Sequence, residues 1–288
     1  MRNLKVAVLS KNDIKIEPHT PLFETGRDRA RFKWSSAFGG IEMMDACFVN
    51  HAFTPHIHDE LMFGVVHQGV KRFQRERKTH YVTRHGLSIN NAGDLHTGER
   101  AEGEFIEYSS LYLTAGALAE AGLPSGFYFA EAVIKDGDVW KLLRAAIASP
   151  SDTLLVEQSI SQALCLAAMR YGGDERLNRL RKKQTGTIST AVEFLHEHLD
   201  KDMKLTELAA LAGLSVRQFI RSFKHHKGVT PHRYLINIRI QRARELIRFD
   251  QSLASLALEV GFADQAHFSK TFKAVMGISP QRYRSAFH

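Results

Sequence analysis

Hydrophobic residues between positions 38 and 113 form short runs, separated by His-rich, Gly or Asn-Ala-Gly turn segments. The runs cover residues 41–49, 60–66, 69–75, 79–84, 86–90 and 104–113. Short, regularly spaced runs of this kind are typical of the strands of antiparallel β-sandwiches and β-barrels. The pattern therefore predicts a β domain in the N-terminal half of the chain.

The periodicity changes after residue 115, where apolar residues recur three and four positions apart. Residues 139–148 and 152–171 are therefore expected to form amphipathic helices. In the second of these helices, Leu155, Ile160 and Leu164 fall roughly on one side. This apolar face could cover the β domain, the C-terminal half or a second copy of the chain.

A polar and strongly charged stretch over residues 172–186 is typical of a linker, and every later hydrophobic run has helical spacing. The predicted fold class is α+β with two domains. We expect a cupin-like β-barrel with flanking helices over residues 1–172, a linker over 173–187, and an all-α domain over 188–288.

Composition agrees with a globular protein of two domains. The chain has 288 residues, of which 44% are hydrophobic and 24% are charged. It has no apolar run of about 18 residues, and its N-terminal apolar run is too short for a signal peptide, so we expect a cytoplasmic protein without a membrane partner. The two cysteines, Cys47 and Cys165, lie far apart and are expected to be small buried side chains.

The formal net charge of +8 is concentrated in one segment. Between residues 204 and 248 the chain has two acidic and ten basic side chains, namely Lys204, Arg217, Arg221, Lys224, Lys227, Arg233, Arg239, Arg242, Arg244 and Arg248. A compact segment with this excess attracts a polyanion, of which nucleic acid is the commonest inside cells. Solvated helix faces in a basic protein are the alternative interpretation.

Two segments, which start at Leu205 and Ser252, repeat one sequence unit. Ten positions match, pairing Leu208, Ala209, Gly213, Phe219, Phe223, Lys224, Gly228, Pro231, Arg233 and Tyr234 with Leu256, Ala257, Gly261, Phe268, Phe272, Lys273, Gly277, Pro280, Arg282 and Tyr283. Each unit reads as a short helix, a glycine-containing turn and a second helix, which is the helix-turn-helix arrangement. Gly213 and Gly261 are expected in the turns, where a positive φ favours glycine.

The second helix of each unit has an apolar face and a polar face. In the first unit, Phe219 and Phe223 are expected to anchor the helix in the core. The side chains expected to contact DNA are Arg217, Gln218, Arg221, Lys224, Gln265, His267 and Lys270. Such a helix can enter a major groove, where arginine suits guanine. A plain helical bundle would explain the phenylalanines but not the duplication.

The C-terminal hundred residues resemble the AraC/XylS family of transcription regulators, through LTELAALAGLS, FIRSFKHHKGVTPHRYL, RIQRARELI and VGFADQAHFSKTFKAVMGISPQRYR. The resemblance implies a helix over residues 231–249 that joins two helix-turn-helix units, whose second helices enter successive major grooves of promoter DNA. The family's base-facing positions fall on Arg217, Ile220, Arg221, Ala266, His267 and Lys270. It further implies activation through RNA polymerase and a homodimer formed by the N-terminal half.

HAFTPHIHDELMFGVVHQGVKRFQ and NNAGDLHTGE resemble the cupin-like effector domain of such regulators, which implies a small-molecule effector. The candidate effector contacts are His56, His58, Glu60, His96 and Tyr108. The first three would share one face of an extended strand.

The histidines could contact an effector, make structural hydrogen bonds or hold a metal ion. Metal-dependent cupins place a glutamate about four residues after the second histidine, where this chain has Met62 and Phe63. We therefore expect neither a metal ion nor another cofactor.

No catalytic residues are expected, because the sequence has no glycine-rich phosphate loop and no serine or cysteine with a recognisable activating partner. The most specific prediction is a sequence-specific DNA-binding transcription regulator that responds to an effector. Two alternatives stay open at this point. One is a metal-dependent cupin enzyme fused to a DNA-targeting module, and the other is a non-specific nucleic-acid packaging protein.

Overall fold

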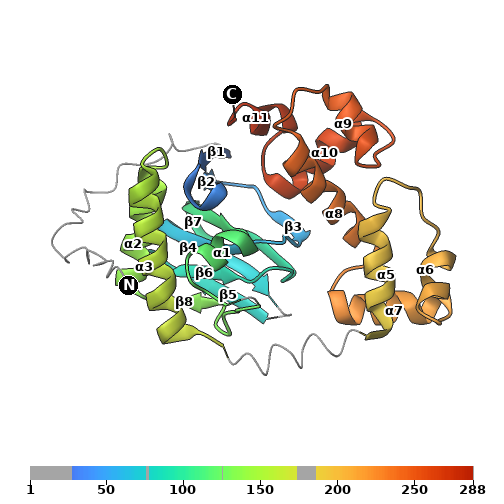
Figure 1. Cartoon of the computed structure of the whole chain (residues 1–288), viewed down its shortest axis with the longest axis horizontal. Coiled ribbons are helices and arrows are strands. Elements are labelled where there is room, and N and C mark those ends of the chain that lie inside the picture. The colour runs from blue at the N-terminus through green and yellow to red at the C-terminus, as the bar shows by residue number, and fades with distance from the viewer. Residues whose placement is uncertain (1–27, 76–77, 125, 174–185, 288) are drawn as a thin grey trace, which may run out of the picture.

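The computed structural model describes residues 28–75, 78–124, 126–173 and 186–287, and a β-rich half lies beside a helical half (Figure 1). The strands are β1 (Arg29–Ser35), β2 (Ile41–Phe48), β3 (Phe53–His56), β4 (Leu61–Arg75), β5 (Lys78–Val82), β6 (Leu87–Asn90), β7 (His96–Leu113) and β8 (Val133–Ile134). They form one antiparallel sheet in the order β1-β2-β7-β4-β6-β8, with β3 paired to β7 and β5 to β4.

One prediction about the strands is wrong. The runs 60–66 and 69–75 were expected to be two strands, but they form the single long strand β4, whose pairing with β7 shifts register between Val66 and Lys71. Gly69 has a φ of +80° there, and a Cβ would lie 2.4 Å from the carbonyl oxygen of Phe105. Because bulges bend a strand and strengthen its twist, β4 can pair along both halves of a curved sheet.

Helices cover one face of this sheet. They are α1 (Ala115–Glu120), α2 (Gly137–Ala148) and α3 (Thr153–Tyr171), with a 3-10 turn η1 (Ala37–Gly39) nearby. Ile160 and Leu164 of α3 are buried in the hydrophobic cluster that also contains Leu111 of β7 and Leu143 of α2, so the apolar face of α3 packs within the N-terminal domain, one of the three options left open by its pattern. Cys165 faces outward and is exposed, which corrects the expectation that both cysteines are buried.

The helical half contains α5 (Gly186–Glu197), α6 (Leu205–Leu211), α7 (Val216–Lys227), α8 (Pro231–Leu246), α9 (Leu253–Glu259), α10 (Gln265–Met276) and α11 (Pro280–Arg284). Helices α6–α7 and α9–α10 correspond to the two sequence repeats, and they lie toward opposite ends of α8 (Figure 1). With 16 residues, α8 is about 24 Å long. Most of the predicted linker, residues 174–185, lies outside the described residues.

Each repeat has its own aromatic core. Phe219 and Phe223 of α7 pack with Tyr234 of α8, while Phe268 and Phe272 of α10 are buried in the second unit. These rings lie on the inward faces of the second helices, as their spacing predicts.

The two halves of the chain also share a core. Tyr283 of α11 meets Phe32 of β1 with ring centroids 4.7 Å apart, and Gly277 lies close to Phe48 and Phe53. On the first unit, Ile57 of the β domain joins the core around Phe219. Both helix-turn-helix units are therefore packed against the β domain.

The shared core predicts a large effect for one phenylalanine. Phe272→Ala should lower the free energy of unfolding by about 3 to 5 kcal/mol, because it leaves a cavity among fully buried side chains. Leu258→Ala on the neighbouring helix α9 is the control, since Leu258 is 63% exposed, and it should change stability by less than about 0.5 kcal/mol. Urea denaturation followed by circular dichroism measures both; equal losses would contradict the assignment of the core.

Candidate nucleic-acid interface and effector site

Helix α7 is fixed at both ends by its sequence. The Ser215 side chain accepts a hydrogen bond from the Gln218 backbone N–H at the N-terminus, and Gly228 adopts the left-handed conformation at the C-terminus. With the aromatic face buried, Arg217, Arg221 and Lys224 are all exposed to solvent. The first unit therefore presents a cationic helix face, as the spacing predicts.

Gln218 has an additional role in the structure. Its side-chain Oε1 accepts from the backbone N–H of Ser215 at 3.1 Å and from the Ser215 hydroxyl at 2.7 Å. These contacts complete a capping box, which stabilises the helix N-terminus. The Gln218 acceptor oxygen, predicted to face DNA, therefore serves the helix cap.

Helix α10 presents the second polar face. The Asp264 carboxylate accepts from the backbone N–H of His267 at 2.7 Å and so caps the N-terminus. Gln265, His267 and Lys270 are exposed on the side opposite to the buried phenylalanines. Gly277, at the C-terminal end of α10, lies close to Phe53 of β3, while the exposed residues near the N-terminus are those that would read base edges.

The turn between the two helices of each unit has the expected geometry. Gly213 and Gly261 have φ values of +64° and +86°, in the region that favours glycine. At Gly261 a Cβ would also lie 2.7 Å from the backbone oxygen of Leu199 and 2.8 Å from the Arg239 guanidinium. The second turn therefore needs glycine for close packing as well as for its backbone conformation.

Part of the basic excess between residues 204 and 248 serves the fold. Arg239 donates to the backbone oxygens of Leu199 and Lys201 at 2.6 and 2.9 Å, and Arg244 is buried between the two domains. The charge count alone therefore overstated the number of cations that face outward.

The three histidines predicted in the effector domain do converge. His56 and His96 have ring centroids 4.3 Å apart, and His58 lies 4.7 Å from His96. The backbone path of this segment differs from the prediction, because β3 ends at His56 and the chain leaves the strand before His58 and Glu60. The continuous strand expected for these residues is therefore wrong, although the side chains meet.

Hydrogen bonds to the backbone fix which ring nitrogen of each histidine carries the hydrogen. Each Nδ1 lies 2.8 to 2.9 Å from a backbone oxygen, that of Thr54 for His56, Glu60 for His58 and Asp94 for His96. A carbonyl oxygen can only accept, so we assign the hydrogen to Nδ1, which leaves Nε2 as an acceptor.

Burial keeps the histidines neutral. Burial and the neighbouring His58 lower the pKa of His56 to about 3, and burial also lowers the pKa values of His58 and His96. Within the described ranges, no group of three or more His, Cys, Asp or Glu side chains is placed to hold a metal ion.

The inner face of the sheet also carries a buried lysine that the sequence reasoning missed. The Lys71 ammonium lies 3.2 Å from the Ser88 hydroxyl and 4.6 Å from the centre of the Tyr108 ring, and the Tyr108 side chain is buried inside the domain. Burial lowers the pKa of Lys71 to about 8. The only sequence signal was a charged residue within a predicted strand.

Helix α8 contacts the histidine segment directly. Gln241 donates to the backbone oxygen of Ile57 at 2.9 Å, and Asn237 and Arg233 lie 3.5 Å from the backbone oxygen of Pro55. These residues recur about every four positions along one side of α8, where they face the β domain. The helix that joins the two helix-turn-helix units therefore also holds the segment that carries His56 and His58.

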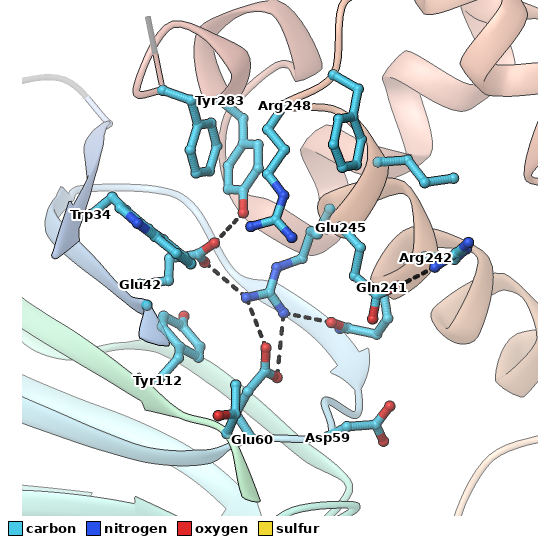
Figure 2. Close-up of a pocket in the computed structure, with 16 residues that line it drawn as sticks. Trp34, Glu42, Asp59, Glu60, Tyr112, Gln241, Arg242, Glu245, Arg248 and Tyr283 are labelled. Atoms are coloured by element: carbon cyan, nitrogen blue, oxygen red, sulfur yellow. Dashed lines mark hydrogen bonds and ion pairs between the residues drawn. The ribbon is translucent and has the colours of Figure 1, made fainter. Parts of the chain in front are cut away.

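An ion-pair network completes this contact. The Arg244 guanidinium lies 2.8 Å from Glu42 Oε1 and 3.2 Å from Glu60 Oε1, and the Tyr283 hydroxyl donates to the other oxygen of Glu42. Figure 2 shows Glu42 and Glu60 on the side of the sheet, across from Gln241 on α8. Burial raises the pKa of Glu42. At Glu60 burial also acts to raise the pKa, but the charges of Arg244 and His58 together with the hydrogen bonds of the carboxylate outweigh it, so the pKa is lowered.

A cavity of about 530 Å³ lies beside this network, within the range of small-molecule sites. Residues from both domains line it, including Trp34, Tyr112, Arg248 and Phe249 (Figure 2). Of the predicted effector contacts, Glu60 lines this cavity, and His56, His58, His96 and Tyr108 do not. Arg244 and Glu42 were missed because no short-range pattern relates positions 202 residues apart.

These features define a two-domain protein in which a helical domain with two helix-turn-helix units packs on a ligand-binding type of β domain. A model of the AraC-like ligand binding domain matches residues 38–164, and a model of a helix-turn-helix domain matches residues 208–286. The chain belongs to the AraC family of transcription regulators, with a DNA-binding domain and a ligand-binding domain.

Three comparisons illustrate this relationship. The uncharacterized regulator YbfI of Bacillus subtilis is 25% identical over 222 residues, which cover 75% of this chain and 81% of YbfI. The transcriptional activator RhaS of Escherichia fergusonii is 36% identical over 112 residues, covering 38% of this chain and 36% of RhaS. The crystal structure of ToxT from Vibrio cholerae has the same overall fold at 11% identity, with a TM-score of 0.55, and covers 90% of this chain and 98% of ToxT.

In the part of the chain that the structure describes, no helix combines the length and the apolar character that crossing a bilayer would require. The enzyme alternative gains no support from the comparisons, since the relatives reported above are named as transcription regulators.

The buried histidines predict a pH dependence. In the unfolded chain a histidine takes up a proton near pH 6.5, whereas His56 in the folded protein does so only near pH 3, so the free energy of unfolding should fall as the pH drops below about 6.5. At pH 5 this one group would account for about 2 kcal/mol. Melting curves between pH 7.5 and 5 measure the effect, and His56→Asn should flatten it. A melting temperature that stays constant over this range would contradict the assignment.

Proposed function

We propose that this protein is an effector-responsive regulator that binds specific promoter sites through α7 and α10. The observation that carries the proposal is the pair of exposed polar helix faces, one on each copy of a duplicated helix-turn-helix unit, joined by the single helix α8. In this proposal Arg217, Arg221 and Lys224 contact DNA from the first unit, and Gln265, His267 and Lys270 contact it from the second.

We propose that each of the three sequence segments has its own function. Residues 1–172 form the effector and dimerisation domain, 173–187 the linker, and 188–288 the DNA-binding domain. His56, His58, Glu60, His96 and Tyr108 are proposed to respond to the effector, because they lie on the inner face or in the segment that α8 contacts. A homodimer would place four helix-turn-helix units on one promoter.

We further propose activation through RNA polymerase, since RhaS, which matches part of the DNA-binding domain, is named as an activator. Such a role places the protein in the cytoplasm and requires no catalytic group. The alternative of a non-specific packaging protein is favoured only by the net charge of +8. It requires many outward cations, whereas part of the basic excess is used inside the fold.

Loss of one arginine separates specific from non-specific binding. On a site selected from random sequences, Arg221→Ala should weaken binding by about 1 to 3 kcal/mol and relax the preference at one base pair, because arginine contacts guanine with two hydrogen bonds. Fluorescence anisotropy on the selected site and on its single-base variants measures both effects.

The matched control is Arg72→Ala, which removes the same charge from the β domain, where Arg72 pairs with Glu99. It should leave the affinity within about twofold of that of the unmodified protein. If Arg221→Ala weakened binding equally on the selected site and on random DNA, the packaging alternative would replace the proposed function.

A further inference from the structure

The β domain carries a pair of carboxylates and an aromatic ring at the edge that faces α8. Glu42 comes from β2, Glu60 from the turn before β4 and Tyr112 from β7, and Glu42 is directly paired with Tyr112 in the sheet. Two carboxylates beside an aromatic face form a site with the chemistry that binds a planar cation. We call Glu42, Glu60 and Tyr112 the cation socket.

The present occupant of the cation socket comes from the other domain. The Arg244 guanidinium contacts both carboxylates, at 2.8 and 3.2 Å, and its centre lies 5.3 Å from the centre of the Tyr112 ring. The arginine side chain is only 6% exposed. A side chain of the DNA-binding domain thus binds to the effector domain in the way that a ligand would.

This occupant does not satisfy all of its own donors. The Nε of Arg244 is buried and has no hydrogen-bond partner among the described residues, although an unpaired buried donor costs free energy. The cavity of about 530 Å³ continues from the socket along Trp34 and the exposed carboxylate of Asp59. A small molecule could therefore enter beside Arg244 and add contacts in the cavity that the arginine does not make.

We propose that the cation socket recognises the guanidinium or ammonium group of a small cationic effector, and that Arg244 occupies it as an internal competitor when the effector is absent. This inference rests on the proposed function of the N-terminal domain as an effector domain. Displacing Arg244 would also weaken the contact of α8 with residues 55–57, so binding in the socket shifts the balance between docked and released DNA-binding domains.

The internal competitor sets the affinity that an effector needs. Arg244 is tethered, so its effective concentration at the socket is of the order of millimolar for a short connection. The apparent affinity for a free cation is therefore reduced by the fraction of molecules in which the socket is empty, and removal of the arginine should unmask the intrinsic affinity. This relation gives a test that does not depend on DNA.

The test uses calorimetric titration of the full chain with agmatine, L-arginine and L-citrulline, in which citrulline is the neutral counterpart of arginine. Agmatine and arginine should bind, and citrulline should bind at least tenfold more weakly. Arg244→Gln should increase the affinity for agmatine at least tenfold, and Glu60→Gln added to Arg244→Gln should remove that gain. Arg72→Gln, which removes an exposed arginine of the β domain, should leave the agmatine affinity unchanged.

A second measurement needs no variant of the buried network. Trp34 lines the cavity, so agmatine should change the tryptophan fluorescence of the unmodified protein in a saturable way, and citrulline at the same concentration should not. Equal binding of arginine and citrulline, or an agmatine affinity that Arg244→Gln leaves unchanged, would overturn the cation socket. A protein that binds agmatine but selects no DNA site would support the socket and contradict the proposed function.

Discussion

The structure depends on the burial of α8 by three different neighbours. One side carries Tyr234 and Ile238 into the core of the first helix-turn-helix unit, and another carries Ile240 and Ala243 into the core of the second. The third side, which includes Asn237, is polar and faces the β domain. Because successive residues on a helix are turned by about 100°, one rigid rod can meet all three neighbours, and a shift of the helix affects all of them together.

This arrangement links the groups that would sense an effector to the groups that would contact DNA. The segment with His56 and His58 lies against α8 through the backbone oxygens of Pro55 and Ile57. The recognition helices α7 and α10 are held to the same helix by their phenylalanines. Coupling between the two sites needs no long series of intermediate residues, because helix α8 contacts both sites and its position can be shifted from either one.

The sequence predicted the parts of the molecule that depend on local spacing. The repeats, the positive φ of Gly213 and Gly261, and the buried Phe219 all follow from patterns within about thirty residues. The single strand β4 was not predicted, because the break at His67 and Gln68 was interpreted as a turn, whereas the chain forms a bulge there that only the pairing with β7 reveals. Pairings between distant segments cannot be read from periodicity, since alternation fixes the face of a strand and not its partner.

The ion pairs of Arg244 show why the domain contact suits a two-state element. Two carboxylates and one guanidinium that are buried together add little net stability, because desolvation offsets most of their attraction. Breaking one partner away while the others stay buried costs about 3 to 5 kcal/mol, so partly separated arrangements are disfavoured. Glu42 and Glu60 are therefore expected either to hold Arg244 fully or to exchange it for another cation. The ion-pair contact as a whole adds little stability, but its partly broken forms are high in free energy. Such a contact gives two discrete domain arrangements of similar free energy, and a small ligand can shift the equilibrium between them.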